Sequence, residues 1–326
     1  MLDHDAFERI VTEANQAPSV HNAQPARWRL QRDVIEVAAD LSVQLPEADP
    51  DQSAIGLSCG AAVEATMLAC TARGFQTHVV DHWDDNNRHT WRAHRLAAQI
   101  YLSEGGRPDA LYDQLGARFT WRSNFEQETP RLFGWTRQDT TLVLDAPTRT
   151  WFADHNDTAS LAILNRPAFR RELLSWIRLD PVHPRWSFDG LSREALLMPK
   201  AVARKVRLGF GPLWSLLRLT GGTKALTAER AQTLTAPVIA AFHVPAGLSA
   251  TEAGRAYLRL WLEATRLGFA GWPMAALTDH APTRAAVAKR LNIGADRRLV
   301  QVIRFGKPTG PRPPRARRPI AEIMND

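Results

Sequence analysis

Residues 60–75 read GAAVEATMLACTARGF, and residues 254–269, far along the chain, read GRAYLRLWLEATRLGF. When the two stretches are aligned without a gap, six of the sixteen positions are identical, including both glycines and the final phenylalanine. Unrelated segments would agree at about one position, so the chain contains an internal repeat. Each copy predicts a helix that ends at a glycine and leads into an extended segment. Two unrelated core helices, each ended by glycine, remain an alternative explanation.

The segments around the repeat mix strands and helices. In the second copy, apolar residues recur at helical spacing over a wide stripe, which suits a helix buried between other elements. A hairpin is predicted with strands at 28–31 and 34–37 joined by Arg32 and Asp33. Further strands are predicted over 76–81, 95–102, 141–144, 237–244 and 299–305, and helices over 167–177 and 282–291. Strands with interspersed helices favour an α+β sandwich.

The composition is that of an ordinary globular protein. The chain has 326 residues, of which 44% are hydrophobic and 23% charged, and this length is sufficient for two domains. No apolar run reaches the ~18 residues expected of a membrane span, so no integral membrane segment is predicted. Residues 1–5 are polar and acidic, unlike a signal peptide, which makes a cytoplasmic location the expectation. Cys59 and Cys70 fall in a predicted helix and are interpreted as packing residues.

The net charge is +7. A solvated basic surface explains this value, and so does an anionic partner such as nucleotide phosphates, nucleic acid or a membrane surface. Charge alone does not choose among them.

Two short motifs carry the chemistry. Residues 17–25 read APSVHNAQP, in which Ser19 suits a local hydrogen bond, Asn22 offers a donor and an acceptor, and Pro25 stiffens the exit into the hairpin. Residues 118–122 read RFTWR and offer two guanidinium groups and a hydroxyl just before a helical pattern, a combination that favours an anion. Taken alone, the second motif is better explained by surface charges, because such spacing is common by chance, and it gains weight only beside the other motifs.

The first motif resembles the APSxxNxQP turn of the FMN-dependent nitroreductase family, and the second resembles the R-x-[S/T]-x-R segment with which that family holds FMN. In ordinary members both motifs lie in one chain, the arginine motif first, and two chains build two sites. Here the order is reversed and each motif occurs once. The resemblance therefore implies the double-length subgroup, with a nitroreductase-like unit at 1–106 fused to a second at 107–326 in an intramolecular pseudo-dimer that has one FMN site.

Two further segments join the site through this resemblance. Residues 271–277 resemble the family's loop along the flavin ring, although Ala275 replaces the usual Glu and Ala276 the usual Gly; an ordinary buried turn is an equal alternative. Residues 306–319 are proline-rich and basic, which on composition indicates a disordered tail or a nucleic-acid arm. In the family a basic residue after the last strand reaches the FMN phosphate. The cofactor-binding residues implied are Pro18, Ser19, Val20, Asn22, Gln24, Arg118, Phe119, Thr120, Arg122, Pro273, Met274, Ala275, Arg315, Arg317 and Arg318.

The function implied is that of an oxidoreductase with ping-pong kinetics, in which NAD(P)H reduces FMN and a nitroaromatic, quinone or enone then takes two electrons. No catalytic side chain is expected, because the flavin carries the chemistry, and no metal is expected, because no Cys/His metal spacing is present. His21 is interpreted as an exposed turn residue rather than an acid or base. The partners expected are small molecules and no nucleic acid, with the chain a monomer or a homodimer.

The alternative function is a protein that sequesters FMN under a lid with little turnover. The predicted lid spans 200–235, which begins with a basic amphipathic stretch and continues with an apolar cluster broken by glycines. A core helix pair and peripheral membrane contact remain alternatives for this segment. A basic nucleic-acid-binding protein is a more distant possibility, since aromatic interleaving and a recognised module are both missing.

Overall fold

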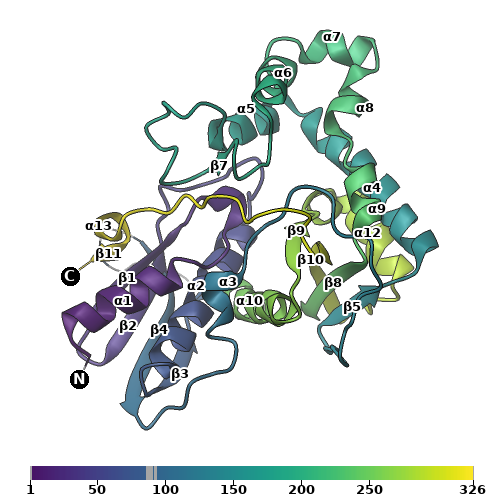
Figure 1. Cartoon of the computed structure of the whole chain (residues 1–326). Helices are drawn as coiled ribbons and strands as arrows, with labels where there is room; N and C mark the ends of the chain where they lie inside the picture. The colour runs from purple at the N-terminus through teal and green to yellow at the C-terminus, as the bar shows by residue number, and fades with distance from the viewer. Residues whose placement is uncertain (1, 86–90, 92–93, 326) are drawn as a thin grey trace.

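The computed structural model describes residues 2–85, 91 and 94–325. Two main sheets lie on either side of a central pair of helices (Figure 1). The first sheet has the strand order β11-β1-β2-β4-β3, with β1 at Ala26–Gln31, β2 at Val34–Ala39, β3 at Phe75–Asp81, β4 at Arg95–Glu104 and β11 at Met324–Asn325. The second has the order β5-β8-β10-β9, with β5 at Thr140–Val143, β8 at Val238–Pro245, β9 at Ala270–Pro273 and β10 at Arg297–Gly306.

A small parallel pair, β6 (Ile177–Arg178) and β7 (Leu191–Ser192), stands apart from both sheets. The helices are α1 (His4–Ala14), α2 (Ser53–Thr71), α3 (Gln114–Ala117), α4 (Ala146–Leu164), α5 (Pro167–Trp176), α6 (Lys200–Phe210), α7 (Trp214–Leu219), α8 (Gly222–Thr227), α9 (Arg230–Thr235), α10 (Ala250–Arg266), α11 (Ala276–Asp279), α12 (Ala281–Arg290) and α13 (Ile320–Ile323), with a 3-10 turn, η1, at Val20–Asn22. The prediction of an α+β fold is confirmed.

The two copies of the repeat become the central helices α2 and α10, which pack directly on each other. A Cβ atom on Gly60 would lie 1.9 Å from the carbonyl oxygen of Thr251, and one on Gly254 would lie 2.2 Å from the carbonyl oxygen of Leu57. Leu57 and Thr251 each precede their own glycine by three residues, so the two helices make the same contact in exchange. Such reciprocal contacts are the mark of an interface with two-fold symmetry.

The correspondence continues beyond the helices. Each ends before a glycine in the left-handed region, Gly74 with φ of 83° and Gly268 with φ of 84°. Each is followed by an outer strand, β3 or β9, that pairs antiparallel with β4 or β10. The strand orders β1-β2-β4-β3 and β5-β8-β10-β9 are therefore equivalent, and the first sheet differs by the added strand β11.

Two segments cross between the halves. After β10, the chain runs across the molecule to α13 and β11 (the yellow trace in Figure 1), and β11 pairs parallel with β1 through Trp28 and Met324. In the other direction, the segment between β4 and β5 leads from the first sheet to the second, where the backbone N–H of Trp121 donates to the carbonyl oxygen of Gly271 on β9 at 3.1 Å. The C-terminal run is thus a structured strap that belongs to both sheets.

Helix α2 is long and apolar enough to cross a membrane by length and composition, but 78% of its apolar stretch is buried inside the protein. The core helix of a globular protein meets the same criteria, and α2 packs against α1, α10 and strands of the first sheet. Cys59 and Cys70 are both free and buried on this helix, as the packing interpretation predicts.

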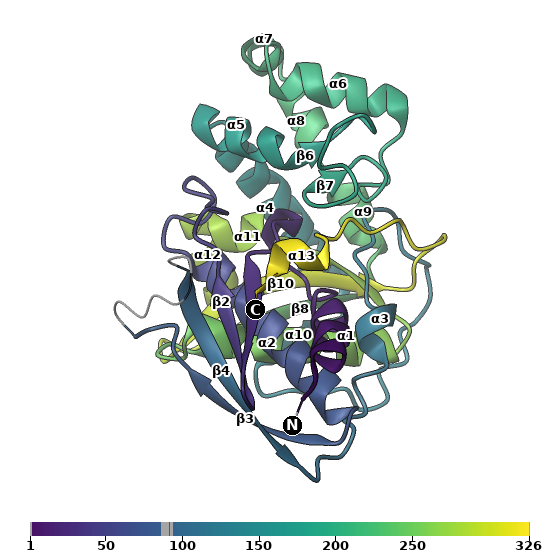
Figure 2. The same ribbon diagram turned by 90° about the vertical axis from the view of Figure 1, so that its left-hand side faces the viewer.

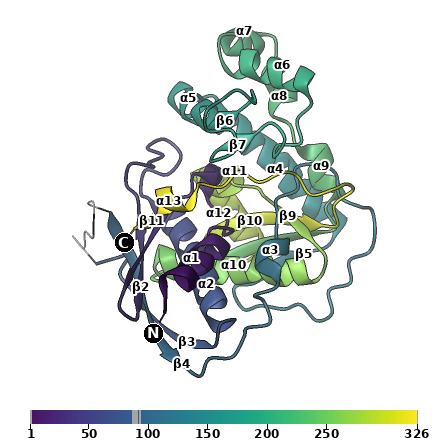
Figure 3. The ribbon, with the colours of Figure 1, turned by 60° about the vertical axis from the view of Figure 1, so that its left-hand side comes forward.

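Between α4 and β8 the chain forms a helical lobe, α5 to α8, at one end of the molecule (Figures 2 and 3). The predicted hairpin is confirmed, since Gln31 pairs with Val34 across the turn at Arg32 and Asp33. The other predicted strands and helices all lie within one or two residues of observed elements. The helices α1, α4 and α6 to α8 and the strand β11 have no counterpart among the predicted elements.

Candidate functional site

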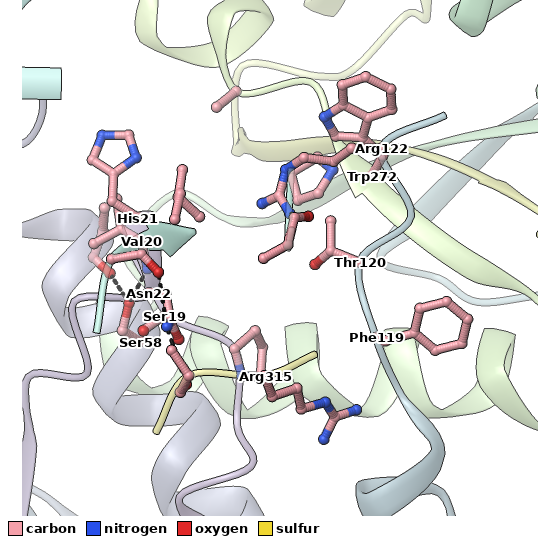
Figure 4. A pocket seen from close by; sticks show the side chains of 18 of the residues that line it. Ser19, Val20, His21, Asn22, Ser58, Phe119, Thr120, Arg122, Trp272 and Arg315 are labelled. Atoms are coloured by element: carbon pink, nitrogen blue, oxygen red, sulfur yellow. Dashed lines mark hydrogen bonds between the residues drawn. The ribbon is translucent and has the colours of Figure 1, made fainter. Parts of the chain in front are cut away.

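One cavity of about 330 Å³ lies where the two halves and the lobe meet. This volume falls in the range of small-molecule sites. It brings the 17–25 turn and the 118–122 segment together, although about a hundred residues separate them, and Figure 4 shows the two motifs on opposite walls. The predicted residues that line it are Pro18, Ser19, Val20, Asn22, Arg118, Phe119, Thr120, Arg122, Pro273, Ala275, Arg315 and Arg317.

The 17–25 turn is built by backbone strain and side-chain hydrogen bonds. His21, Asn22 and Gln24 have φ of 46°, 56° and 52°, a left-handed conformation that is costly for residues other than glycine. Two serines hold it: Ser19 Oγ accepts from the backbone N–H of Gln24 at 3.0 Å, and Ser58 Oγ on α2 accepts from that of Val20 at 3.1 Å. The turn is therefore anchored to the central helix.

Asn22 links this turn to two other walls. Its Nδ2 donates to the carbonyl oxygens of Gly190 in the lobe and Ala316 in the C-terminal strap, at 3.0 and 3.2 Å. Its Oδ1 accepts from Nη1 of Arg317 at 2.8 Å. One amide thus fixes the turn, the lobe and the strap relative to one another, as its donor and acceptor capacity allows.

His21 lines the cavity and is half-buried rather than exposed, which corrects the prediction made for it. Its Nε2 is buried and has no hydrogen-bond partner among the residues that the structure describes. Burial and, to a smaller extent, the charge of Arg122 together lower the pKa of His21 to about 4. The imidazole is therefore neutral near pH 7.

Three arginines from two segments of the chain, 118–122 and the C-terminal strap, converge on one residue, Gln16. Arg118 donates from Nη2 to the carbonyl oxygen of Gln16 at 2.8 Å, and Arg317 donates to the same oxygen at 3.2 Å. Arg315 donates from Nη1 to Oε1 of Gln16 at 2.7 Å. We call Arg118, Arg315 and Arg317 the arginine cluster.

The arginine cluster lacks a negative counterpart. No carboxylate in the described part of the chain forms an ion pair with any of the three, and Nη2 of Arg315 and Nε of Arg317 are buried without partners there. Burial lowers the pKa of Arg118, Arg315 and Arg317 to about 9, 8 and 9, and each cation is further disfavoured by a neighbouring arginine. Removing unpaired cations from water costs free energy, and a bound anion would offset that cost.

Arg122 and Thr120 lie on the wall beyond the arginine cluster, next to Trp272 (Figure 4). Nη1 of Arg122 donates to the carbonyl oxygen of Ala195 in the lobe at 3.1 Å. Burial lowers the pKa of Arg122 to about 10, while the charge of Glu229 opposes this shift. The cavity thus has a second cation, separate from the arginine cluster.

Three predicted site residues do not line this cavity. The Gln24 side chain instead ties the turn to its surroundings: Nε2 donates to the carbonyl oxygen of Phe188 at 2.8 Å, and Oε1 accepts from the backbone N–H of Arg318 at 2.8 Å. The Arg318 guanidinium pairs with Asp189 at 2.9 Å. Met274 is 1% exposed, because its side chain packs in the core of the second half.

The predicted lid over 200–235 contributes no residue to the cavity lining. The lobe covers the cavity with an earlier segment, through Gly190, Leu191 and Ala195. This segment lies over the cavity because it is hydrogen-bonded to the 17–25 turn: the backbone N–H of Gly190 donates to the carbonyl oxygen of Asn22 at 3.2 Å.

Sequence reasoning missed several lining residues. Tyr257 and Trp261 on α10, together with Leu57 and Ser58 on α2, line the cavity from the central helices. The repeat predicted that these helices are buried together, but helical spacing does not say which positions face a cavity.

Asp279, at the end of α11, was also missed. It lines the cavity and is open to it. Desolvation by the cavity walls and the charge of Asp49 together raise the pKa of Asp279 to about 7, while a hydrogen bond with Thr278 and the charge of Arg284 oppose the shift. The cavity therefore contains one acid that titrates near neutrality.

No protein-family model matches the chain. Over 86 residues, or 26% of this chain, it is 35% identical to proteins of two Mycobacterium tuberculosis strains, CDC 1551 / Oshkosh and ATCC 25618 / H37Rv, each named "Putative NAD(P)H nitroreductase". The match covers 25% of each, so the chain spans about a quarter of the length of the curated relatives that it matches. The resemblance to nitroreductases that the motifs predict is confirmed in sequence over this stretch.

Solved structures with similar parts include oxidized iodotyrosine deiodinase bound to FMN and 3-iodo-L-tyrosine, at 15% identity over 64% of this chain and 95% of that one, with a TM-score of 0.38. The FMN-dependent nitroreductase NfnB from Mycobacterium smegmatis, in complex with NADPH, is 20% identical over 60% of this chain and 86% of that one, with a TM-score of 0.33. A nitroreductase with bound FMN from Desulfitobacterium hafniense is 14% identical over 63% of this chain and 93% of that one, with a TM-score of 0.34.

Proposed function

We propose that the chain is an FMN-dependent oxidoreductase of the nitroreductase type with one FMN per chain in the cavity. The observation that carries this proposal is the arginine cluster beside the 17–25 turn, in which Arg118 is buried, Arg315 and Arg317 are half-buried, and none has a carboxylate partner in the described part of the chain. A phosphate dianion satisfies such a cluster because each guanidinium offers several N–H donors in a planar fork. The resemblance of the two lining motifs to those of nitroreductases makes FMN the phosphate-bearing ligand that we favour.

The remaining walls suit the ring of this cofactor. Arg122 and Thr120 offer a cation and a hydroxyl away from the arginine cluster, where negative charge on the pyrimidine edge of the flavin needs stabilisation. Trp272, Pro273 and Ala275 supply apolar surface and backbone groups for the ring. Neutral His21 adds no second positive charge to this wall at neutral pH.

FMN, when bound, supplies two-electron transfer from NAD(P)H to an electron-poor acceptor such as a nitroaromatic, quinone or enone. The chain's own contribution is positional and electrostatic: it holds the phosphate, orients the ring and excludes water beneath the segment 190–195. No side chain is assigned a covalent role. The sequestering alternative draws no support from the predicted lid, because 200–235 lies outside the cavity lining.

We infer that two units, 1–106 and 107–326, are fused into a pseudo-dimer. The support is the exchange of equivalent contacts between Gly60 and Gly254 and the equivalent strand orders of the two sheets. Each unit gives one half of the site, since the 17–25 turn comes from the first and the 118–122 segment from the second.

The test is reconstitution of the purified apoprotein with FMN and with riboflavin, followed by anaerobic addition of NAD(P)H. We expect FMN to bind, riboflavin to bind at least tenfold more weakly because the arginine cluster has no phosphate to hold, and the bound flavin to bleach. Arg317→Ala is expected to erase the preference for FMN, whereas Arg266→Ala, exposed at the end of α10, serves as the matched control. Equal affinity for the two flavins would overturn the assignment of the cluster, and bound flavin that NAD(P)H does not bleach would favour sequestration.

A further inference from the structure

The helical lobe carries its own small core. Trp214 is 2% exposed, stacks near Phe210 with ring centroids 5.7 Å apart, and receives the Arg170 guanidinium over its ring at 4.5 Å. Gly209 lets α6 approach α8, since a Cβ there would lie 2.7 Å from a methyl group of Leu226. The helices of the lobe are therefore packed together, and this packing determines which of their side chains are exposed on the outer face.

That outer face is apolar. Val202, Leu208, Leu213, Leu216 and Leu219 are 42%, 46%, 41%, 58% and 83% exposed, and they are half of the large hydrophobic side chains exposed in the described residues. Leu213, Leu216 and Leu219 fall at intervals of three residues along α7 and its N-cap, so this helix turns one apolar stripe outward. On α6, Val202 and Leu208 are exposed on either side of Lys205. An apolar gathering of this kind on a projecting lobe marks an interaction surface.

The same face is positively charged. Residues 195–228 contain no aspartate or glutamate. The basic residues of this stretch are Lys200, Arg204, Lys205, Arg207, Arg218 and Lys224. All six are exposed, and none forms an ion pair within the part of the chain that the structure describes. The partner that fits this surface must be both anionic and able to take up leucine side chains.

We propose that this face, formed by α6 and α7, docks on an anionic lipid bilayer. Leucines enter the boundary between headgroups and acyl chains, while lysines and arginines at their sides meet lipid phosphates. Nucleic acid satisfies only the charges, because Trp214 is buried and no exposed aromatic ring of the lobe's outer helices is available for base stacking. The surface is separate from the cavity lining, so this inference stands whether or not the cavity binds FMN.

The experiment is sedimentation of the full-length protein with vesicles of phosphatidylcholine alone or mixed with phosphatidylglycerol. We expect binding to the mixed vesicles that falls steeply as salt is raised, and little binding to phosphatidylcholine alone. Neutralising three charges in Arg204→Gln/Lys205→Gln/Arg207→Gln should weaken binding by roughly tenfold or more. Leu216→Ser/Leu219→Ser should weaken vesicle binding comparably, because this double substitution removes the apolar side chains that would enter the bilayer.

Two controls keep the result interpretable. Phe133→Asn removes an 81% exposed ring outside the lobe and should leave vesicle binding unchanged. Circular dichroism melting of each variant shows that the fold is retained, which we expect because every substituted residue is exposed. Absence of binding to anionic vesicles at low salt overturns the proposal, as does unchanged binding by both lobe variants. A wild-type dimer in sedimentation velocity that Leu216→Ser/Leu219→Ser dissociates, without vesicle binding, would make the face an interface between copies.

Discussion

At the scale of single residues, the arginine cluster ties folding to ligand binding. Three guanidinium groups lie near one another with no carboxylate among the described residues to offset their repulsion. Burying unpaired cations costs free energy, so the apoprotein is less stable than its packing allows. An anion that binds only the folded state recovers this cost.

This argument predicts that phosphate stabilises the apoprotein. We expect the melting temperature to rise with added phosphate and to rise further with FMN, since both bind the folded chain alone. In Arg315→Ala/Arg317→Ala the phosphate-dependent rise should vanish, and the melting temperature without phosphate should increase or stay level, because repulsion is relieved. Differential scanning fluorimetry in phosphate and in chloride of equal ionic strength measures both effects. A rise of equal size in the double variant would contradict the prediction.

A second prediction concerns Asp279. Its folded-state pKa of about 7 lies above the ordinary aspartate value of 3.8 that applies to the unfolded chain, so between these values the folded protein retains a proton that the unfolded protein has released. Its contribution to stability is therefore fully present below pH 4 and is lost as pH rises through 7. Asp279→Asn removes this dependence, so the variant should gain most stability over the wild type at pH 8, less at pH 5 and little below pH 4, as measured by urea unfolding.

Asp145→Asn is the matched control for Asp279. Asp145 caps α4 by accepting from the backbone N–H of Thr148 at 2.8 Å, and this hydrogen bond lowers the pKa of Asp145. Its stabilising contribution is present above pH 4 and is lost as pH falls, which is the opposite sign. A pH profile of the same sign for both variants would show that the cavity does not set the behaviour of Asp279.

At the scale of elements, the close approach of α2 and α10 makes a prediction about Gly60. Gly60→Ala would place a methyl group 1.9 Å from the Thr251 carbonyl oxygen, a backbone atom that can yield only if the helices separate. We expect a loss of about 1–3 kcal/mol or more in unfolding free energy by urea denaturation. Gly116→Ala in α3, where a Cβ meets nothing within 4 Å, should be neutral or slightly stabilising. Equal stability of the two variants would contradict the close contact.

The elements also show what periodicity can predict. Alternating patterns and short apolar runs located most strands of both sheets, including β8, which is buried along nearly its whole length, but they did not locate β11. The aligned glycines located the central helices. The lobe resisted prediction because its apolar residues serve two surfaces: Trp214 packs inward while Leu216 and Leu219 point outward. A pattern of apolar residues gives the spacing of a helix but not the identity of what covers it.

The candidate site was predictable to the extent that motifs carry it. Backbone-strained turns need particular residues, so the 17–25 segment is recognisable in the sequence, and its strain is observed at His21 and Asn22. Ser58 and Asp279 could not be found in this way, because each joins the site only through the packing of α2 and α11 against distant segments.

At the scale of the whole molecule, the two sheets and the two central helices are arranged pseudo-symmetrically, but equivalent positions in the two halves carry different sequences. The segment before β5, 131–139, corresponds in position to the turn before β1, but it reads RLFGWTRQD and lacks the APSxxNxQP pattern. Both Arg315 and Arg317 of the strap lie at the cavity that is present, beside Arg118. The symmetry-related position therefore lacks both parts of the site.

This asymmetry predicts one FMN per chain, bound within a single chain. Titration of apoprotein with FMN, followed by fluorescence quenching, should end at one equivalent, and Arg317→Ala should weaken the whole signal rather than half of it. Because both halves of the site are covalently joined, the dissociation constant should not change on dilution of the protein, whereas a site shared between two chains weakens as the dimer dissociates. An end point of two, or an affinity that falls with protein concentration, would mean that the fused halves do not build the site by themselves.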